Sequence, residues 1–572
     1  MKGARVLLEM LKRYDVKHIF GLPGETTIPL YVEWSKFPEI KHILTRDERN
    51  ASFMADAYAK VSFKPGICES PSVGATHVIP GIAEAYKSSV PLIVFTTDVP
   101  LHLEKKNMLT GFEQTPLFSS ITKESLTILK ASEIPFILRR AFRMATTGKP
   151  GPVHIRVPQN ILEEEVASID LRAQKEFSRY PGHRQIADKR EIKKAVELLL
   201  KSETPLIICG QGALYSQAWE EIKELAELLA IPVGTTISGK GSFPERHPLS
   251  IGVIGIRGGT IVSNKAVEEA DLIFYIGCNT DYVTTDGWKL PSADSDKAII
   301  HLDISEAEVS NNYITTSVLI GDAKATLKEM IKVIKDEISQ QIDFLNSPRI
   351  KALNKSLNEY REALREGKSH SKMRPLEVIE TLNELLSERE YILAIDPGIS
   401  AIYTSAFFKA DKPGRRFLFN FSLGALGYAI PASIGAHYAN PEIPIVALTG
   451  DGSFGFTAGE LETIARTEGN IKIILFNNDS FGWIRATIRL LQNASPFATD
   501  FKKVDHVKVA EGFGLRSYKI EKINDLKTLL KEELTRNSPS FIELNVDPED
   551  ELIPPVPSWL KIAKEKKLAH IG

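Results

Sequence analysis

Two side chains that carry hard oxygen atoms, Asp451 and Asn478, stand at the ends of two successive apolar segments. Asp451 ends PIVALTGD (444–451), and Asn478 ends KIILFNN (472–478). Both segments have the short apolar pattern of buried strands, and a helical pattern separates them. In a right-handed crossover the carboxyl ends of the two strands meet at one edge of the sheet, so we expect the side chains to converge. Mg²⁺ prefers such oxygen ligands.

The residues around Asp451 suit a phosphate group. Gly450 and Gly452 let the backbone approach an anion closely, Ser453 adds a hydroxyl group, and the next helix directs its N-terminal dipole toward this point. For this short motif alone, a glycine turn with a helix cap is the simpler interpretation. The second oxygen ligand, at the end of the next strand, makes a metal and diphosphate site the better one.

The rest of the chain has the pattern of a scaffold that positions such a site. Short apolar runs alternate with amphipathic stretches through most of its 572 residues, which are too many for one hydrophobic core. This alternation predicts an α/β fold with doubly wound parallel sheets. Two polar connectors leave three predicted domains and a tail, expected to be a solvated end or a subunit clasp: 1–165, 190–340, 370–550 and 551–572.

Composition excludes several functional classes. Lys and Arg (71) nearly balance Asp and Glu (73), so there is no electrostatic reason to expect a nucleic acid partner. The N-terminus lacks the apolar centre of a signal peptide, and no window offers ~18 uninterrupted apolar residues, so we expect no membrane partner. The three cysteines are far apart and lack metal-ligand spacing, which is typical of a reducing compartment. We predict a cytoplasmic protein.

GDGS (450–453), followed about two dozen residues later by NN (477–478), resembles the signature of thiamine diphosphate (ThDP) enzymes. The resemblance covers nearly the whole chain and points to the acetolactate synthase, pyruvate oxidase and benzoylformate decarboxylase family. It is closest overall to the acetolactate synthase large (catalytic) subunit. It implies pyrimidine-binding, central Rossmann-like and diphosphate-binding domains. It also implies that Asp451, Asn478 and the backbone carbonyl of Ser480 bind Mg²⁺.

The same resemblance places Glu48 at the activating position of the cofactor. There a carboxylate hydrogen-bonds a ring nitrogen of the aminopyrimidine and raises its basicity. Without the resemblance, Glu48 beside Arg46 and Arg49 is a surface ion pair, and Leu426 is a core leucine. With it, the Leu426 side chain is a wedge that bends the cofactor. The other implied cofactor contacts are His77, Gly398, Gly424, Gly452 and Ser453.

Three segments depart from the family pattern or leave a choice. FEQT stands where the family often has FQET, so either Glu113 or Gln114 faces the reacting carbon, and we choose Gln114 as the catalytic residue. Lys123 either neutralises a substrate carboxylate or is a surface lysine. Thr487 stands where acetolactate synthases have a substrate-shaping tryptophan, and FGWIR is more similar to decarboxylases and lyases. Its Arg485 either binds an acidic substrate tail or lies on a helix surface.

The resemblance implies an enzyme that decarboxylates a 2-oxo acid such as pyruvate and transfers the bound acyl carbanion to a second carbonyl. The alternatives are a decarboxylase or carbon–carbon lyase that releases an aldehyde, and an FAD-dependent pyruvate oxidase. FAD is not favoured, because GCNTDY (277–282) lacks the arginine of flavin-binding relatives, although GIRGG, HLDIS and GDA remain. The presence of Glu48 argues against a catalytically silent ThDP-binding protein.

The predicted assembly follows from the positions of two residues. Glu48 belongs to the first domain and Asp451 to the third, and the family builds each site between two subunits. We therefore expect a homodimer or homotetramer, and the sequence leaves open whether a regulatory subunit joins it.

Overall fold

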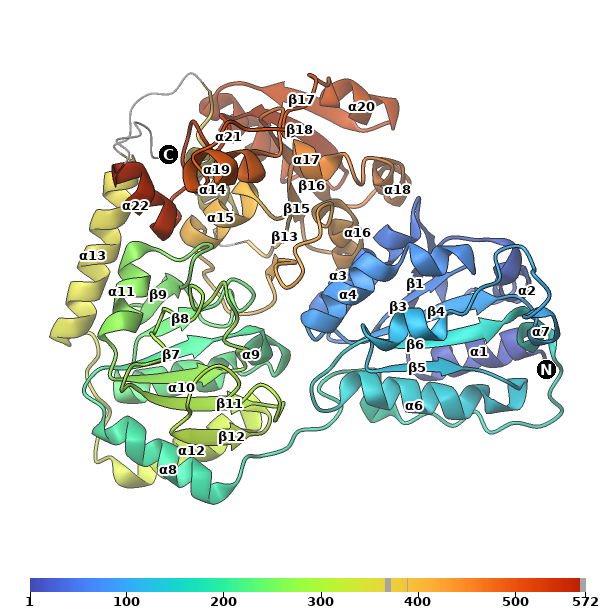
Figure 1. The fold of residues 1–572 in the computed structure, drawn as a ribbon, viewed down its shortest axis with the longest axis horizontal. Coiled ribbons are helices and arrows are strands. Elements are labelled where there is room, and N and C mark those ends of the chain that lie inside the picture. Colours follow the sequence, from blue (N-terminus) through green and yellow to red (C-terminus); the bar gives the residue numbers. More distant parts are fainter. Residues whose placement is uncertain (366–371, 388, 566–572) are drawn as a thin grey trace.

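The computed structural model describes residues 1–365, 372–387 and 389–565 of the chain. They form three domains, each with a six-stranded sheet flanked by helices (Figure 1). Every strand pairing within these sheets is parallel. Strands such as β4 and β16 are buried along their whole length, as expected for sheets covered on both faces. The predicted fold class is confirmed.

The N-terminal domain, blue to cyan in Figure 1, has the strand order β2-β1-β3-β4-β6-β5. Its strands are β1 (His18–Gly21), β2 (Lys41–Leu44), β3 (Gly66–Ser70), β4 (Leu92–Asp98), β5 (Glu124–Thr127) and β6 (Val153–Pro158). Its helices are α1 (Gly3–Arg13), α2 (Ile28–Trp34), α3 (Glu48–Ser62), α4 (Ile79–Lys87), α5 (Thr115–Ser119), α6 (Ile134–Thr146) and α7 (Gln159–Glu163).

The central domain, green in Figure 1, has the strand order β12-β11-β10-β7-β8-β9. Its strands are β7 (Pro205–Cys209), β8 (Val233–Thr235), β9 (Ser250–Val253), β10 (Leu272–Ile276), β11 (Ala298–Asp303) and β12 (Ser317–Ile320). The helices of this part are α8 (Lys189–Lys201), α9 (Gln211–Tyr215), α10 (Trp219–Leu229), α11 (Ile261–Glu269), α12 (Ala323–Glu337) and α13 (Pro348–Arg365).

The C-terminal domain has the strand order β14-β13-β15-β16-β18-β17. Its strands are β13 (Ile392–Ile395), β14 (Phe417–Leu418), β15 (Ile445–Gly450), β16 (Ile471–Asn477), β17 (Arg516–Ile520) and β18 (Ser540–Asn545). Its helices are α14 (Pro375–Leu386), α15 (Ile399–Phe407), α16 (Ala429–Ala439), α17 (Asp451–Phe454), α18 (Glu460–Thr467), α19 (Gly482–Leu491), α20 (His506–Gly512), α21 (Ile523–Glu533) and α22 (Pro557–Glu565).

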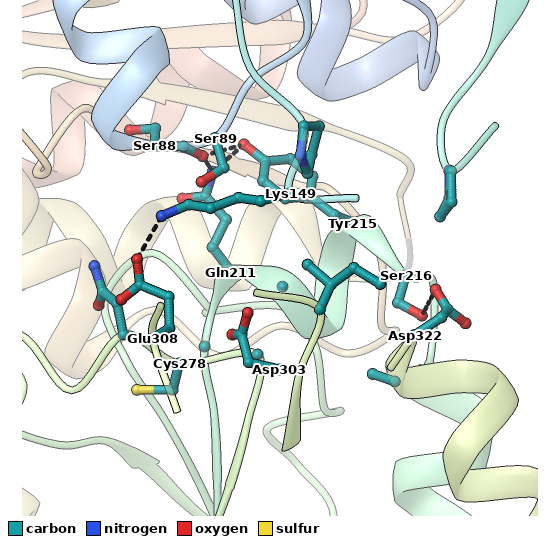
Figure 2. A pocket seen from close by; sticks show the side chains of 18 of the residues that line it. Ser88, Ser89, Lys149, Gln211, Tyr215, Ser216, Cys278, Asp303, Glu308 and Asp322 are labelled. Carbon is teal, nitrogen blue, oxygen red and sulfur yellow. Dashed lines mark hydrogen bonds and ion pairs between the residues drawn. The ribbon is translucent and has the colours of Figure 1, made fainter. Parts of the chain in front are cut away.

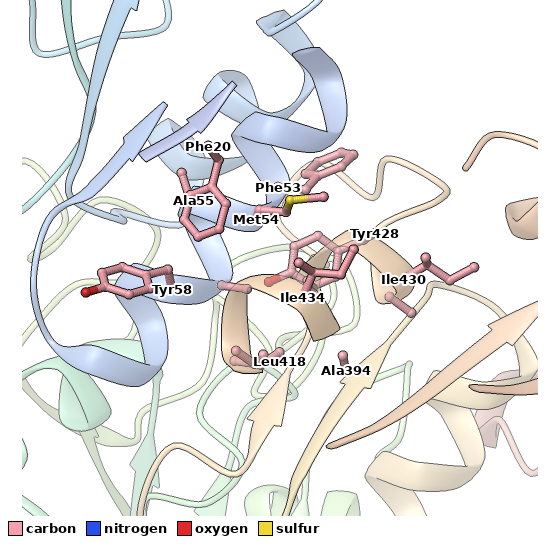
Figure 3. Packing of buried hydrophobic residues seen from close by; sticks show 14 of the residues in the cluster. Phe20, Phe53, Met54, Ala55, Tyr58, Ala394, Leu418, Tyr428, Ile430 and Ile434 are labelled. Atoms are coloured by element: carbon pink, nitrogen blue, oxygen red, sulfur yellow. The ribbon is translucent and has the colours of Figure 1, made fainter. Parts of the chain in front are cut away.

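The first and third domains share one hydrophobic cluster, in which α3 packs against α16 (Figure 3). Phe53 meets the ring of Tyr428 edge to face at 5.5 Å, and the Tyr428 hydroxyl donates to Asp56 at 2.7 Å. Asp56 also forms a buried ion pair of 2.7 Å with Lys60. Because this polar cluster is paired within a closed apolar surface, it fixes the two domains relative to each other.

The tail differs from the expectation of a solvated end. Trp559 of α22 is 4% exposed and stacks on Trp483 of α19 with ring centroids 4.2 Å apart. Residues 566–572 of the predicted tail, like 366–371 of the second connector, lie outside the described residues. Within the described part, no helix is both long and apolar enough to cross a membrane. The sheets fall inside the three predicted segments, whose ends stay predictions.

Candidate active site

Asp451 and Asn478 lie together at the carboxyl edge of the third sheet. β15 and β16 are parallel neighbours, with Gly450 opposite Phe476. The backbone N–H of Ser480 donates to both side chains, at 3.2 Å to Asp451 Oδ2 and 3.1 Å to Asn478 Oδ1. A carboxylate and an amide oxygen therefore converge on one point, as the crossover argument predicts.

A pocket of about 1030 Å³ opens over this point. Eight of the residues predicted to contact cofactor or metal line it: Gly398, Gly424, Leu426, Asp451, Gly452, Ser453, Asn478 and Ser480. The pocket also receives the N-terminus of α15, because Gly398, Ile399 and Ser400 line it. A helix N-terminus and a glycine-rich turn that face the same pocket provide N–H groups for an anion.

Sequence reasoning missed a second carboxylate side chain in the pocket, Glu549. Its Oε2 accepts a 2.9 Å hydrogen bond from Asn478 Nδ2, and the residue is 3% exposed. Burial raises the pKa of the Asp451 carboxyl to about 6. It raises that of Glu549 to about 7, and the nearby charge of Asp451 adds to this rise. Raised pKa values at both carboxyls show that the site disfavours two buried negative charges, which a divalent cation bound by Asp451 and Asn478 would offset.

Two further carboxylates, also missed, hold the loop that carries Gly424 and Leu426. Glu84 of α4 accepts hydrogen bonds from the backbone N–H groups of Leu423 (2.8 Å) and Gly424 (3.2 Å). At the other end of the loop, Asp396 accepts from the Tyr428 N–H at 2.7 Å. A loop that is tied at both ends presents its backbone to a ligand in one conformation.

Glu48 is buried at the start of α3 and does not line this pocket. Its Oε2 lies 3.2 Å from His77 Nδ1, so the structure brings these two predicted residues together. The neighbouring Arg49 extends instead toward the C-terminal domain, where its guanidinium donates to the Leu426 carbonyl. Within one chain, Glu48 and Asp451 are thus not parts of one cavity.

Gln114 has the contacts of a structural amide. It is fully buried, and its Nε2 donates to Ser72 Oγ at 3.2 Å and to the Thr97 carbonyl at 3.1 Å. Its Oε1 accepts from Thr96 at 2.5 Å. The neighbouring Glu113 is exposed. All these contacts are within the N-terminal domain, so a role of Gln114 at a reacting carbon stays a prediction.

The other candidate side chains also have partners. Lys123 is not a surface lysine, because its ammonium donates to the carbonyls of Met144 (2.5 Å) and Thr147 (2.9 Å), and burial lowers its pKa to about 8. Arg485 pairs with Asp550 at 3.0 Å, which makes it a clamp between α19 and the segment that follows β18. The Thr487 hydroxyl donates to the carbonyl of its own helix. One turn earlier, Trp483 lines the pocket.

A second pocket, of about 1000 Å³, lies where the N-terminal and central domains meet (Figure 2). It includes residues that follow β7, β10 and β11, the edge at which such sheets bind nucleotides. Lys149 crosses it to pair with Glu308 at 2.5 Å, and Tyr215 donates to the Ser88 carbonyl at 2.8 Å. Burial raises the pKa of Asp303, at the end of β11, to about 6.

Family models match all three domains. A model described as the N-terminal TPP binding domain of thiamine pyrophosphate enzymes matches residues 1–117. The central domain of these enzymes matches 192–330, and their C-terminal TPP binding domain matches 396–544. Together with the pocket over Asp451, these matches define the class: the chain is a ThDP-dependent enzyme.

Relatives that match over most of their length narrow this class. The chain is 35% identical to a probable acetolactate synthase large subunit of Methanocaldococcus jannaschii, over 97% of this chain and 94% of the relative. It is 32% identical to the acetolactate synthase large subunit of Cyanidium caldarium, over 96% of this chain and 94% of the relative. It is 30% identical to the chloroplastic acetolactate synthase of Arabidopsis thaliana, over 97% of this chain and 83% of the relative. The chain belongs to the acetolactate synthase family, and the resemblance seen in the sequence is confirmed.

Proposed function

We propose that this enzyme decarboxylates one 2-oxo acid, with pyruvate as the first candidate, and joins its acyl group to the carbonyl carbon of a second 2-oxo acid in a Mg²⁺-dependent reaction. One observation carries the Mg²⁺ dependence. Asp451 Oδ2 and Asn478 Oδ1 meet at the Ser480 N–H beside the buried Glu549 carboxyl. The acetolactate synthase relatives support the choice of ligation over simple aldehyde release.

The residues of the pocket divide into three roles. The side chains of Asp451 and Asn478, with the Ser480 carbonyl, would hold Mg²⁺. Gly398, Gly452 and Ser453 would receive the diphosphate at the N-terminus of α15 and the glycine-rich turn. The loop held by Glu84 and Asp396 would present the Gly424 and Leu426 backbone, with the Leu426 side chain as wedge, to the pyrimidine.

ThDP, when bound, supplies a carbon nucleophile and the electron sink for loss of CO₂. The protein has to exclude water, orient the substrates and move one proton at the aminopyrimidine. We assign the proton step to Glu48, whose carboxylate would hydrogen-bond the ring nitrogen. His77, 3.2 Å from Glu48 Oε2, would orient that carboxylate.

A second copy of the chain would complete the site. Glu48 does not line the pocket of its own chain. Apolar side chains at and beside the pocket are about half exposed, namely Leu423 (49%), Phe456 (49%) and Ile484 (53%), as expected of a surface that another subunit covers. We propose a homodimer or a dimer of dimers. Relatives are named large subunits, so a smaller regulatory subunit is the further partner to test.

One incubation separates the proposed reaction from its alternatives. The purified protein is supplied with ThDP, Mg²⁺ and a panel of 2-oxo acids, and the products are analysed for 2-hydroxy-2-alkyl-3-oxo acid, free aldehyde and peroxide. The proposal expects the ligation product as the main one. Aldehyde alone would instead show a decarboxylase or lyase, and peroxide with a flavin absorption band would show an oxidase with FAD in the second pocket.

A further inference from the structure

Three side chains that can bind a metal ion meet at the start of α3, and none of them lines the pocket over Asp451. They are Asp47, Glu48 and His77, and their ligand atoms all lie within 4.8 Å of one another. His77 Nδ1 is 3.2 Å from Glu48 Oε2 and 3.7 Å from Asp47 Oδ1. Among the described residues, no other group of three or more histidine, cysteine and carboxylate side chains has this spacing.

The spacing of these atoms suits one tetrahedral ion. Zn²⁺ binds imidazole nitrogen and carboxylate oxygen at about 2.0–2.2 Å in a tetrahedral array, which sets two ligand atoms about 3.3–3.6 Å apart. The separations from His77 Nδ1, 3.2 Å to Glu48 Oε2 and 3.7 Å to Asp47 Oδ1, lie at the two ends of this range. His77 and each carboxylate are thus already spaced as two ligands of one ion. Three protein ligands leave the fourth position of the ion open to water.

The Glu48 carboxylate lacks the partners that a buried charge requires. Only 6% of the residue is exposed, yet within the described part of the chain this carboxylate accepts no hydrogen bond, and its one ion-pair contact is with His77. Its other oxygen faces Gly74, where a Cβ would lie 2.5 Å from Oε1. A buried carboxylate is stabilised by an ion pair, by hydrogen bonds or by a bound metal. The ring nitrogen of ThDP meets this need in the proposed holoenzyme, and a cation can meet it when ThDP is absent.

The cluster is accessible from solvent and is held by backbone contacts. The side chains of His77 and Asp47 are 53% and 44% exposed, so an ion can enter. Asp47 caps α3, because its Oδ1 accepts a 2.9 Å hydrogen bond from the Arg49 N–H. His77 follows the short 3₁₀ helix of residues 73–76, and its N–H donates to the Gly74 carbonyl at 2.9 Å. Ligands on segments that are already fixed lose little freedom when an ion binds.

The imidazole decides which ion the cluster prefers. Mg²⁺ takes oxygen ligands in an octahedral array, as Asp451 and Asn478 would provide. An imidazole nitrogen suits Zn²⁺ and other divalent transition metal ions instead. The two places would therefore bind different ions, and Mg²⁺ at the proposed catalytic site would leave the cluster at α3 free. An ion on Glu48 would occupy the carboxylate that the aminopyrimidine needs.

We infer that Asp47, Glu48 and His77 form an inhibitory site for a divalent transition metal ion, with Zn²⁺ as the first candidate, and that this ion competes with the aminopyrimidine of ThDP for Glu48. Binding of the ion stands apart from the proposed function. The inhibition rests on that function, because it follows from the proton step assigned to Glu48. The site thus makes activation of the enzyme depend on the ratio of ThDP to free Zn²⁺.

Titration of the ThDP-free, full-length protein with Co²⁺ tests the site directly. Co²⁺ replaces Zn²⁺ in tetrahedral sites, where it absorbs visible light much more strongly than in an octahedral oxygen site. We expect one strongly absorbing Co²⁺ per chain, which Zn²⁺ displaces. His77→Asn removes the nitrogen ligand and should abolish this absorption. It should also lower the affinity for Zn²⁺ by more than about 10-fold, because even groups that only orient a ligand contribute 10- to 100-fold.

Two further variants separate loss of a ligand from loss of the fold. Asp47→Asn keeps an oxygen that can cap α3 but removes the charge, so it should weaken Zn²⁺ binding with the helix intact. His102→Asn removes an exposed imidazole elsewhere in the same domain and is the matched control. It should bind Co²⁺ and Zn²⁺ as tightly as the parent does.

Competition with ThDP tests the inhibition. At millimolar Mg²⁺ and a Zn²⁺ concentration about ten times its own Kd, the apparent Kd for ThDP should rise about 10-fold in the parent and in His102→Asn. In His77→Asn the same Zn²⁺ concentration should cause a much smaller rise, measured against the ThDP affinity of that variant without Zn²⁺. An effect of Zn²⁺ at the Asp451 site would be equal in all three proteins.

Weak Co²⁺ absorption in the parent, or equally strong absorption in His77→Asn, would overturn the site and leave the proposed function untouched. Binding of Zn²⁺ at the cluster without a change in ThDP affinity would overturn the inhibition. A parent enzyme that forms no ligation product with ThDP and Mg²⁺ in the absence of Zn²⁺ would overturn the proposed function but not the metal site.

Discussion

The side-chain amide of Asn478 donates a 2.9 Å hydrogen bond to Oε2 of Glu549, a residue 71 positions later in the chain. Because the Nδ2 end of the amide is held in this way, its Oδ1 end is directed toward Asp451 and Ser480. Glu549 has room for its carboxylate only because residue 482 is glycine, where a Cβ would lie 1.6 Å from Oε2. The connector after β18 therefore helps to define the proposed metal site.

Loss of Glu549 is expected to weaken the metal site without removing a ligand. In Glu549→Ala the Nδ2 end of the Asn478 amide loses its partner and only the contacts of Oδ1 with Ser480 orient it. Groups that orient metal ligands typically contribute 10- to 100-fold to metal affinity. We expect the Mg²⁺ concentration that half-saturates ThDP binding to rise by about 10-fold, measured by quenching of protein fluorescence. Glu551→Ala, an exposed carboxylate two residues away, is the control. Equal Mg²⁺ requirements in both variants would contradict the orienting role.

Asp451→Ala should abolish Mg²⁺-dependent ThDP binding, because it removes the one carboxylate assigned as a ligand. We expect an affinity loss of more than about 100-fold at millimolar Mg²⁺, and the same loss when the parent enzyme is stripped with a chelator. Isothermal titration with ThDP measures both. Asp479→Asn is the control. Residue 479 has a left-handed backbone conformation, which asparagine tolerates, so this variant should bind ThDP as tightly as the parent enzyme does. Binding by Asp451→Ala that still responds to Mg²⁺ would show that the metal assignment is wrong.

How far the sequence predicted this site depends on which elements carry each residue. Asp451 and Asn478 stand at the ends of consecutive strands, so one crossover rule brings them together. Glu549 follows β18, which is the sheet neighbour of β16 although β17 intervenes in sequence. The order of strands in the sheet cannot be inferred from the local sequence pattern. The sequence therefore does not predict that a carboxylate of DPEDE (547–551) lies in the site.

The residues supplied by other domains were beyond prediction for a different reason. Glu84, and Arg257 at the pocket over Asp451, reach the third domain through docking of whole domains, which depends on side-chain packing along helices such as α3 and α16. For Gln114 the same limit concerns its hydrogen-bond partners. The resemblance predicts a catalytic amide, which stays a prediction, and the sequence does not show that the amide donates to Ser72 and Thr97. Motifs thus located the cofactor chemistry, while long-range packing decided which neighbours surround it.

The tail is expected to support the pocket through its tryptophan. Trp559→Ala removes a buried ring that stacks on Trp483, a loss of about 3–5 kcal/mol for such truncations. We expect a lower thermal midpoint and a raised KM for the 2-oxo acid, since Trp483, which lines the pocket, loses its support. Trp559→Phe retains part of the stacking contact, so its thermal midpoint and KM should lie between those of Trp559→Ala and the parent enzyme. A change in stability with an unchanged KM would limit the tail to a structural role.

The last prediction concerns where one active site ends and the next begins. Glu48→Gln keeps the shape of the side chain but loses the carboxylate that tunes the ring nitrogen, so turnover should fall by about 10²–10⁴-fold while ThDP still binds. Asp451→Ala is expected to be inactive for a different reason, because it loses a ligand of the metal. If each site takes Glu48 from one subunit and Asp451 from the other, a mixed dimer of the two variants has one intact site.

Unfolding and refolding an equal mixture of the two variants would then give half mixed dimers, each with one of two sites, and about a quarter of the parent activity. Each variant refolded alone is the control and should stay inactive. No recovery in a mixture that light scattering shows to be dimeric would place Glu48 and Asp451 of the same chain in one site. That result would require movement of α3 toward the pocket, because Glu48 does not line it in the present structure.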